Sequence, residues 1–188
     1  MTGEMFEIRW HGRGGQGAKT ASELLAKAMI KKGKYIQSMP EFGAERQGAP
    51  IEAFTRISDK PILLHTGITH PNMVIIVDET LLKNIPVCEG LKPNGLVLVN
   101  TSRTSKEIKS ELKCKEKVYV IDATKIAIEE IGKPIPNAAM LGAVAKITGL
   151  ADTKILKDKF REEFLVKVGE QVVNNNLKAI QRAYNEVK

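Results

Sequence analysis

Four glycines occupy positions 12, 14, 15 and 17 of the segment WHGRGGQGAKT, residues 10–20. The pattern GxGxxG formed by Gly12–Gly17 is typical of dinucleotide-binding loops, because glycines let the backbone approach a pyrophosphate at the start of a helix. That chemistry also needs an acidic residue about 20 positions later, at the end of the next strand, to bind a ribose hydroxyl. Here the next expected strand ends at residues 37–39, and Glu41 follows only after a proline. The dinucleotide interpretation is therefore incomplete.

The same loop nearly matches the phosphate-binding pattern GxxxxGK[ST], in which a lysine directly follows the last glycine. Ala18 separates Gly17 from Lys19, and one extra helical residue turns the lysine by about 100°. Asp78 and Asp122 each end a hydrophobic strand, as a Walker B aspartate would, but such residues are also ordinary at strand ends of α/β sheets. A free-standing Rossmann-like nucleotide-binding protein or reductase remains the alternative hypothesis.

The number of glycines in this loop exceeds what a strand-to-helix turn requires, which favours close backbone approach to a ligand or to another chain. Arg13, Gln16 and Lys19 add the capacity to attract an anion. We therefore predict a glycine loop that faces a ligand or a subunit. It is made of Gly12, Arg13, Gly14, Gly15, Gln16 and Gly17.

A second polar segment, PEFGAERQGAP at residues 40–50, also combines proline and glycine with charged residues. Carboxylates near an arginine suit acid–base chemistry, and they suit a buried ion pair at an interface equally well. No serine, cysteine or histidine nucleophile accompanies them, and the chain holds no complete catalytic set, so no catalytic residue is predicted. We expect the chain to shape an active site of other subunits. The predicted second cleft loop consists of Glu41, Phe42, Gly43, Glu45, Arg46, Gln47 and Gly48.

The remaining reactive side chains form no recognisable site. Cys88 and Cys114 belong to no CxxC pattern and have no histidine at ligand spacing, so we predict no metal site and no disulfide framework. Tyr184 and Lys188 match the Tyr-x-x-x-Lys pattern of short-chain reductases, but Tyr184 belongs to an apolar helical stripe, which favours core packing. The net charge of +7 permits a basic binding module as a third hypothesis. Because the lysines are spread through expected helices without interleaved aromatics, we expect no nucleic-acid partner.

Hydrophobic periodicity predicts the elements that must position these loops. The expected strands are 5–10, 35–39, 51–57, 73–78, 95–101 and 117–122. The expected helices are 18–32, 105–113, 123–132 and 136–149, followed by an all-helical tail. Because the loop at 40–50 is too short for a crossover helix, the strand after it should be antiparallel or separated in the sheet. The predicted fold class is α/β: a three-layer Rossmann-like domain with a mostly parallel, mixed sheet and a C-terminal helical extension.

We expect a single domain over residues 1–188, with its core at about 5–150 and the C-terminal helices at about 152–187. Asp152 or Thr153 should cap the helical tail. The helix at 136–149 is rich in Ala and Gly, which predicts tight packing on the sheet or across a subunit boundary. The tail carries an amphipathic stripe of Val173, Leu177, Ile180, Tyr184 and Val187. No membrane span and no signal peptide are visible, so a cytoplasmic location is expected.

The ordered set of motifs resembles a known family. HGRGGQG, then FGAERQGAP and FTRISDKPI, are followed by HPNMVIIVDETLL, LKPNGLVLVNTS and PNAAMLGAVAKITG. Together they cover roughly residues 5–185, and they are far more specific than GxGxxG alone. The order closely resembles that of the gamma subunit of 2-oxoacid:ferredoxin oxidoreductases, with the pyruvate-specific branch favoured.

The resemblance implies a complex that oxidatively decarboxylates a 2-oxoacid to an acyl-CoA and passes two electrons to ferredoxin. It implies thiamine diphosphate, [4Fe-4S] clusters and coenzyme A in the complex, with none bound by this chain alone. The implied partners are thiamine-binding and ferredoxin-like subunits, with ferredoxin as electron acceptor. Related indolepyruvate and 2-oxoglutarate enzymes carry a similar domain, so the resemblance leaves the substrate open.

Overall fold

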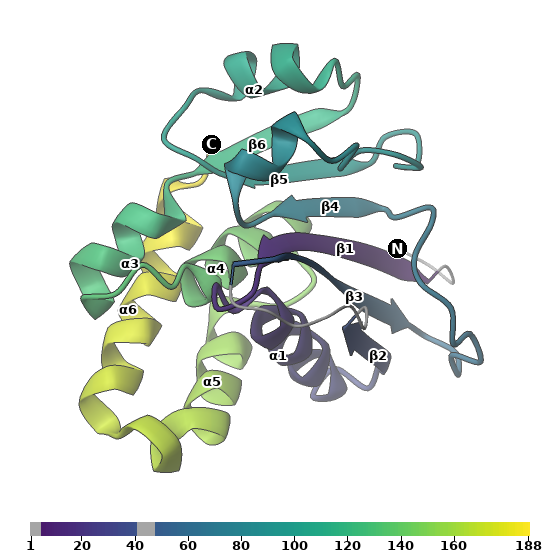
Figure 1. Ribbon diagram of the computed structural model, residues 1–188. Coiled ribbons are helices and arrows are strands. Elements are labelled where there is room, and N and C mark those ends of the chain that lie inside the picture. Colours follow the sequence, from purple (N-terminus) through teal and green to yellow (C-terminus); the bar gives the residue numbers. More distant parts are fainter. Residues whose placement is uncertain (1–4, 41–47) are drawn as a thin grey trace.

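The computed structural model describes residues 5–40 and 48–188 and contains a six-stranded sheet with the order β2-β3-β1-β4-β5-β6 (Figure 1). The strands are β1 (Phe6–Arg13), β2 (Tyr35–Pro40), β3 (Pro50–Ser58), β4 (Met73–Ile76), β5 (Leu96–Asn100) and β6 (Lys117–Ile121). The helices are α1 (Ala18–Ile30), the 3-10 helix η1 (Glu79–Lys83), α2 (Ser105–Leu112), α3 (Ala123–Ile131), α4 (Asn137–Thr148), α5 (Thr153–Val168) and α6 (Glu170–Glu186). All the strands and helices expected from periodicity are present.

The sheet is mixed, as predicted. β1, β4, β5 and β6 are parallel, whereas β3 pairs antiparallel with both β1 and β2. The chain builds one half of the sheet with β2 and β3 on one side of β1, and then crosses to place β4 on the other side. The carboxyl ends of β1 and β4 therefore flank the point where the strand order reverses, which is where open α/β sheets bind their ligands.

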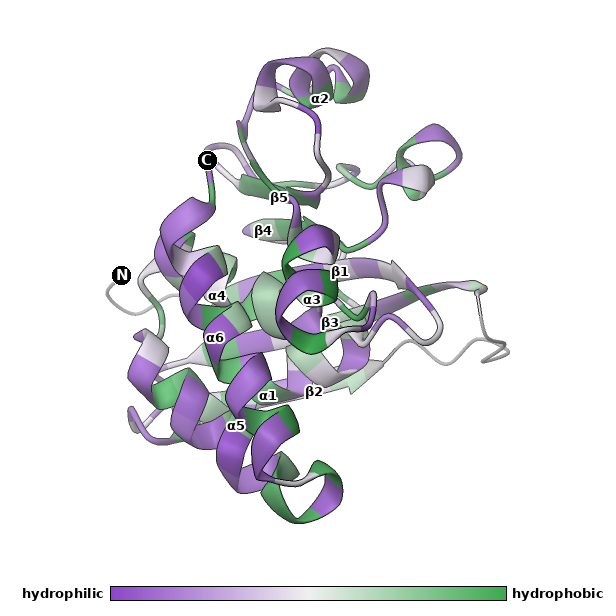
Figure 2. Cartoon of the chain, turned by 90° about the vertical axis from the view of Figure 1, so that its left-hand side faces the viewer, coloured by the Kyte–Doolittle hydropathy of each residue, from purple (hydrophilic) through white to green (hydrophobic). Residues whose placement is uncertain are grey.

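Alternation along β1 separates a dry face from a polar face. Ile8 and Trp10 are fully buried in the core beneath helices α1, α3, α4, α5 and α6. The Trp10 indole nitrogen donates to Thr55 Oγ1 of β3 at 3.1 Å, so its polar atom is satisfied. In Figure 2 the helical layer faces the viewer, and mixed purple and green bands along α5 and α6 reflect their amphipathic sequences.

Helix α4 is buried on nearly all sides, and its small residues face another helix of the same chain. Residues 138–145 are all buried. A side chain added at Gly142 would lie 2.0 Å from the backbone oxygen of Ile180 in α6. The sequence predicted tight packing on the sheet or across a subunit boundary, and the closest approach is instead made to α6. This follows from the amphipathic stripe of α6, whose Val173 and Ile180 are fully buried.

The C-terminal helices are thus an extension in sequence order only, because α6 belongs to the main helical layer. Asp152 caps α5, accepting a hydrogen bond from the backbone N–H of Ile155. After α6, the backbone of Lys188 exchanges two hydrogen bonds with Val120 of β6. The end of the chain is therefore joined to the edge of the sheet.

The opposite face of the sheet carries a short helical layer, which completes the three-layer arrangement. η1 and α2 cover β4, β5 and β6 over a small apolar cluster that includes Val74, Val97 and Ile108. Over β1 and β3 this face is covered by irregular backbone. The buried side chains of Arg9 and Arg56 donate hydrogen bonds to carbonyl groups of that backbone. Among the described residues, no helix is long and apolar enough to cross a membrane.

Candidate functional site

The glycine loop lies at the carboxyl end of β1, beside the carboxyl end of β4. Its backbone continues directly into α1, whose N-cap is Gly17 in the left-handed conformation, with φ of 79°. No side chain caps this helix, and its first turn contains no acidic residue. Uncapped N–H groups at a helix start favour negative charge. The loop thus lies where a ligand or partner can reach it.

Two of the four glycines serve close packing inside this chain. A side chain at Gly12 would lie 3.0 Å from the Ala18 side chain, and one at Gly17 would lie 2.7 Å from the Asn137 amide nitrogen. The sequence favoured approach to a ligand or another chain for the whole loop. For Gly12 and Gly17 the close neighbours are instead α1 and α4. Gly14 and the exposed Gly15 remain as the positions for approach from outside.

The polar side chains of the loop are engaged within the chain. Gln16 accepts a hydrogen bond from the Arg13 backbone N–H at 2.8 Å, and its amide donates to Asp78 Oδ2 at 2.6 Å. The Arg13 guanidinium donates to Thr80 Oγ1 at 2.9 Å and to the Gly48 carbonyl at 3.0 Å, and it lies 3.3 Å from Asp78. Arg13 thus links the glycine loop to Gly48 before β3 and to Asp78 and Thr80 after β4. We call this set of contacts the Arg13 clamp. Arg13 and Gln16, two of the side chains expected to attract an anion, thus also bond within the chain, and Lys19 is exposed.

The electrostatics of the clamp favour an ionised Asp78. Burial by itself raises the pKa of this carboxyl, but hydrogen bonds from Thr80 and Gln16 and the charge of Arg13 outweigh that effect and lower the pKa. Thr80 contributes both its backbone N–H and its hydroxyl to Asp78 Oδ1. Asp78 is therefore a structural anion that holds the glycine loop against the start of η1.

We expect Asp78→Asn to lower the free energy of unfolding by about 1–2 kcal/mol near neutral pH, because charge-assisted hydrogen bonds weaken and the amide faces the Gln16 amide. A lowered pKa in the folded state contributes stability above the ordinary value of 3.8 and loses it as pH falls through the folded-state pKa. Urea unfolding of both proteins from about pH 7 to about pH 3 should show their difference shrinking toward acid. A difference that stays constant with pH would contradict the ionic role.

The second cleft loop meets the glycine loop at its base. Glu41, Phe42, Gly43, Glu45, Arg46 and Gln47 lie outside the described residues. Gly48 is described, and its backbone N–H donates to the Gly14 carbonyl at 3.1 Å, while the Gly14 N–H donates to the Ala49 carbonyl at 2.9 Å. Because β2 runs parallel to β1, its last residue, Pro40, also lies at this edge of the sheet.

The nucleotide interpretation loses its structural basis in the strand order. In a dinucleotide-binding unit the second strand lies next to the first, so that its terminal acid reaches the ribose. Here β3 separates β2 from β1. β2 has no acid at its end, and it is also displaced from β1. For both reasons, no acidic side chain of β2 is placed to bind a ribose next to the glycine loop.

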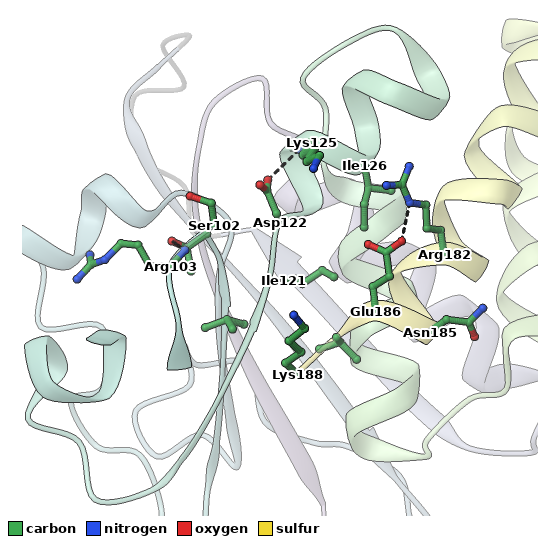
Figure 3. Close-up of a pocket in the computed structure, with 13 residues that line it drawn as sticks. Ser102, Arg103, Ile121, Asp122, Lys125, Ile126, Arg182, Asn185, Glu186 and Lys188 are labelled. Atoms are coloured by element: carbon green, nitrogen blue, oxygen red, sulfur yellow. Dashed lines mark hydrogen bonds and ion pairs between the residues drawn. The ribbon is translucent and has the colours of Figure 1, made fainter. Parts of the chain in front are cut away.

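Two hollows lie farther along the same edge. A cavity of about 290 Å³ beside Gln16 and Asp78 extends over the ends of β4, β5 and β6. A larger pocket of about 660 Å³ lies between β6, α3 and the end of α6 (Figure 3). Its Arg182 pairs with Glu129, Glu130 and Glu186, and its Arg103 pairs with Glu111. These arginines are thus neutralised within the chain. In the part of the chain described, no three His, Cys, Asp or Glu side chains gather as a metal site.

Sequence reasoning missed a polar row on β1. Arg9, His11 and Arg13 alternate with Ile8 and Trp10, so they share the face opposite the helices. Both Arg9 and His11 are buried. The signal was present in the segment EIRWHGR, where charged residues occupy every second position of a strand. It was not recognised, because charged alternation normally marks a solvent-facing side of the sheet.

Fold and site together define a class: an α/β subunit with a glycine loop at the switch point of its sheet and no catalytic set among its described residues. The family model described as pyruvate ferredoxin/flavodoxin oxidoreductase matches residues 7–186. The chain therefore belongs to this family, and it is an oxidoreductase subunit of the gamma type.

Similar proteins match over nearly their whole length. The chain is 49% identical to the common gamma subunit of the pyruvate/ketoisovalerate oxidoreductases of Thermococcus kodakarensis, covering 97% of each chain. It is 48% identical to the pyruvate synthase subunit PorC of Methanocaldococcus jannaschii, again covering 97% of each. The crystal structure of pyruvate oxidoreductase subunit PORC from Thermotoga maritima aligns with a TM-score of 0.88 at 42% identity, covering 98% of both chains. These matches do not favour a free-standing nucleotide-binding protein.

Proposed function

We propose that this chain is the gamma subunit of a pyruvate:ferredoxin oxidoreductase. The complex converts pyruvate and coenzyme A to acetyl-CoA and carbon dioxide and passes two electrons to ferredoxin. The observation that supports this most strongly is the near full-length similarity to PorC and gamma subunits.

The cofactors of this reaction are assigned to the other subunits. Thiamine diphosphate supplies the carbanion chemistry of the decarboxylation when it is bound. A [4Fe-4S] cluster needs four cysteine ligands, and this chain contains only two cysteines. The thiamine-binding and ferredoxin-like subunits are therefore the proposed partners, with ferredoxin as the external acceptor.

The glycine loop and the base of the second cleft loop form this chain's wall of the shared cleft. Gly15 is exposed, Lys19 is exposed one turn away, and α1 begins without a capping side chain. These features suit an anionic group, since the helix start carries partial positive charge. We therefore assign to this wall a role in framing the approach of coenzyme A, whose phosphates are anionic.

Substrate choice is assigned to the other subunits. The Thermococcus kodakarensis relative is named as a gamma subunit common to pyruvate and ketoisovalerate oxidoreductases. A chain shared between two enzymes cannot by itself distinguish their substrates. The glycine loop presents mainly backbone, which agrees with leaving the choice of substrate to the other subunits.

Co-expression with the thiamine-binding and ferredoxin-like chains of the same organism tests the proposal. We expect one complex that reduces a viologen dye in a coenzyme A-dependent reaction, with pyruvate the best of several 2-oxoacids. The isolated chain, titrated with NAD, NADP and ATP, should bind none of them at micromolar concentration. A chain that never associates with the thiamine-binding subunit, or that binds a nucleotide tightly alone, contradicts the proposal.

A further inference from the structure

The polar row on β1 ends in an unusual side-chain arrangement at His11. His11 is 2% exposed, and its Nε2 accepts a hydrogen bond from Arg9 Nε at 3.1 Å. A ring nitrogen that accepts carries no proton, so the neutral imidazole has its proton on Nδ1. Arg9 therefore selects the tautomer of His11.

Arg9 can do this because the rest of its guanidinium is held rigidly. Its terminal nitrogens donate to three backbone carbonyls, those of Ile68 at 3.3 Å, Val87 at 3.0 Å and Glu89 at 2.6 Å. The side chain is 8% exposed. Such a buried, multiply bonded guanidinium is fixed in position, and this leaves His11 little freedom to rotate.

The protonated nitrogen of His11 lies beside Glu52. Nδ1 lies 3.2 Å from Glu52 Oε1 on the neighbouring strand β3, where the two residues are register partners. The contact is close but is not aligned as a hydrogen bond, so Nδ1 is a buried donor without a well-formed partner among the described residues. An unsatisfied buried donor costs about 1–3 kcal/mol and calls for an explanation.

Glu52 is partly exposed, and only one of its two carboxylate oxygens contacts a polar group of the described residues. Its side chain is 30% exposed, and Oε2 has no polar partner in the part of the chain described. Burial raises the pKa of its carboxyl, but the contact with His11 and the charge of Arg9 outweigh burial and lower the pKa. Glu52 lies two residues after Pro50, the register partner of Arg13. The carboxylate therefore belongs to the same corner of the sheet as the Arg13 clamp and the glycine loop.

We propose that Arg9 and His11 are positioning residues for Glu52, and that Glu52 is a docking carboxylate for a cationic side chain of the neighbouring subunit. The proposal rests on the proposed function. When a guanidinium or ammonium group of that subunit bonds Oε2, the carboxylate turns and Oε1 accepts the His11 Nδ1–H. The unsatisfied donor in the isolated chain is thus satisfied on assembly. Ion pairs of this kind set orientation and specificity at interfaces.

The central test compares assembly of the wild-type chain and Glu52→Gln with the other subunits of the complex. Gln keeps the size of the side chain and removes its charge. We expect the dissociation constant to rise at least about 30-fold, as when a charge pair that becomes buried on assembly loses the charge of one partner. The wild-type affinity should also weaken with salt between ionic strengths of about 0.05 and 0.5 M, and the variant should lose that dependence. Glu111→Gln is the matched control, because Glu111 is 31% exposed and pairs with Arg103 inside the chain.

The role of His11 is tested separately. His11→Leu removes the donor, whereas His11→Asn keeps an N–H at a similar place and should largely restore affinity. The titratable groups that act on Glu52 among the described residues are His11 and Arg9. Because Glu52 must be ionised, assembly is lost as pH falls through its pKa, and without the N–H of His11 that midpoint moves to higher pH. A merely structural histidine would leave the midpoint unchanged.

Two results would overturn the proposal. The first is unchanged assembly of Glu52→Gln, which excludes a docking role. Alternatively, Glu52→Gln assembles normally while kcat falls and the pH–rate profile changes, which assigns the carboxylate to proton transfer in the reaction. A wild-type chain that fails to assemble with a thiamine-binding subunit is a different failure, because it contradicts the proposed function itself.

Discussion

Gly142→Ala is expected to lower the free energy of unfolding of the isolated chain by about 3 kcal/mol or more, at the upper end of what overpacking costs. The new methyl group would lie 2.0 Å from the backbone oxygen of Ile180. A backbone atom cannot move aside as a flexible side chain does, so α4 and α6 must separate. Both helices are fully buried at this contact. In a chain of this length, that loss corresponds to a fall in melting temperature of about 6–12 °C.

Gly132→Ala is the control for this experiment. Gly132 has a φ of 80°, which disfavours alanine, but nothing lies within 4 Å of the added carbon. We expect a cost of about 1–2 kcal/mol there, from backbone conformation alone. Urea unfolding of both variants separates the two effects. Equal losses would mean that α4 and α6 adjust to the methyl group and that their close contact contributes little.

Gly14→Val is expected to reduce coenzyme A-dependent turnover of the assembled complex at least about tenfold, while the isolated chain keeps its stability within about 1 kcal/mol. A shift of about 1 Å in a shared cleft suffices for losses of this size. Gly14 is not among the described glycines with positive φ, so a side chain there needs no left-handed backbone. Its hydrogen bonds to Gly48 and Ala49 use only main-chain atoms. We therefore expect the substitution to act mainly on what approaches the loop from outside.

Gly15→Val is a poorer test of the same idea. Gly15 has a φ of 95°, so a β-branched residue strains the fold itself. Gly12→Ala is the comparison variant for an effect on folding, because its side chain would lie 3.0 Å from the Ala18 side chain. Steady-state kinetics of the complex and unfolding of the isolated chain should be measured for all three. We expect Gly12→Ala to destabilise the isolated chain. If Gly14→Val destabilises it as well, the glycines are needed only to form the strand-to-helix turn.

The local elements were predictable because each has a local cause. Alternation marked β1 and β3, continuous β-branched runs marked β4, and the i, i+4, i+7 stripe marked α6. Asp152 was recognised as a cap from its type and place alone. The short segment at 40–50 excluded a crossover helix, which left the next strand either antiparallel or separated in the sheet, and β3 is antiparallel to β2. The ordered motifs predicted the family.

The partners of the glycine loop were not predictable in this way. Gln16 meets Asp78, and Arg13 meets Thr80, across more than sixty positions of sequence. No local period records such pairs, because they arise only when β4 is placed beside β1. The loop therefore looked like a damaged nucleotide site with free polar side chains. In the folded chain the same side chains join neighbouring loops.

The sequence by itself determined which segments form strands and helices, that the sheet is mixed, and to which family the chain belongs. These properties depend on residue type and short spacing. Only the tertiary structure decided that β3 lies between β1 and β2, that α4 packs on α6, and that His11 is aimed at Glu52. The physical reason is that strand order and helix contacts result from burying whole faces against one another. Many chain paths satisfy the same local pattern, and packing selects among them.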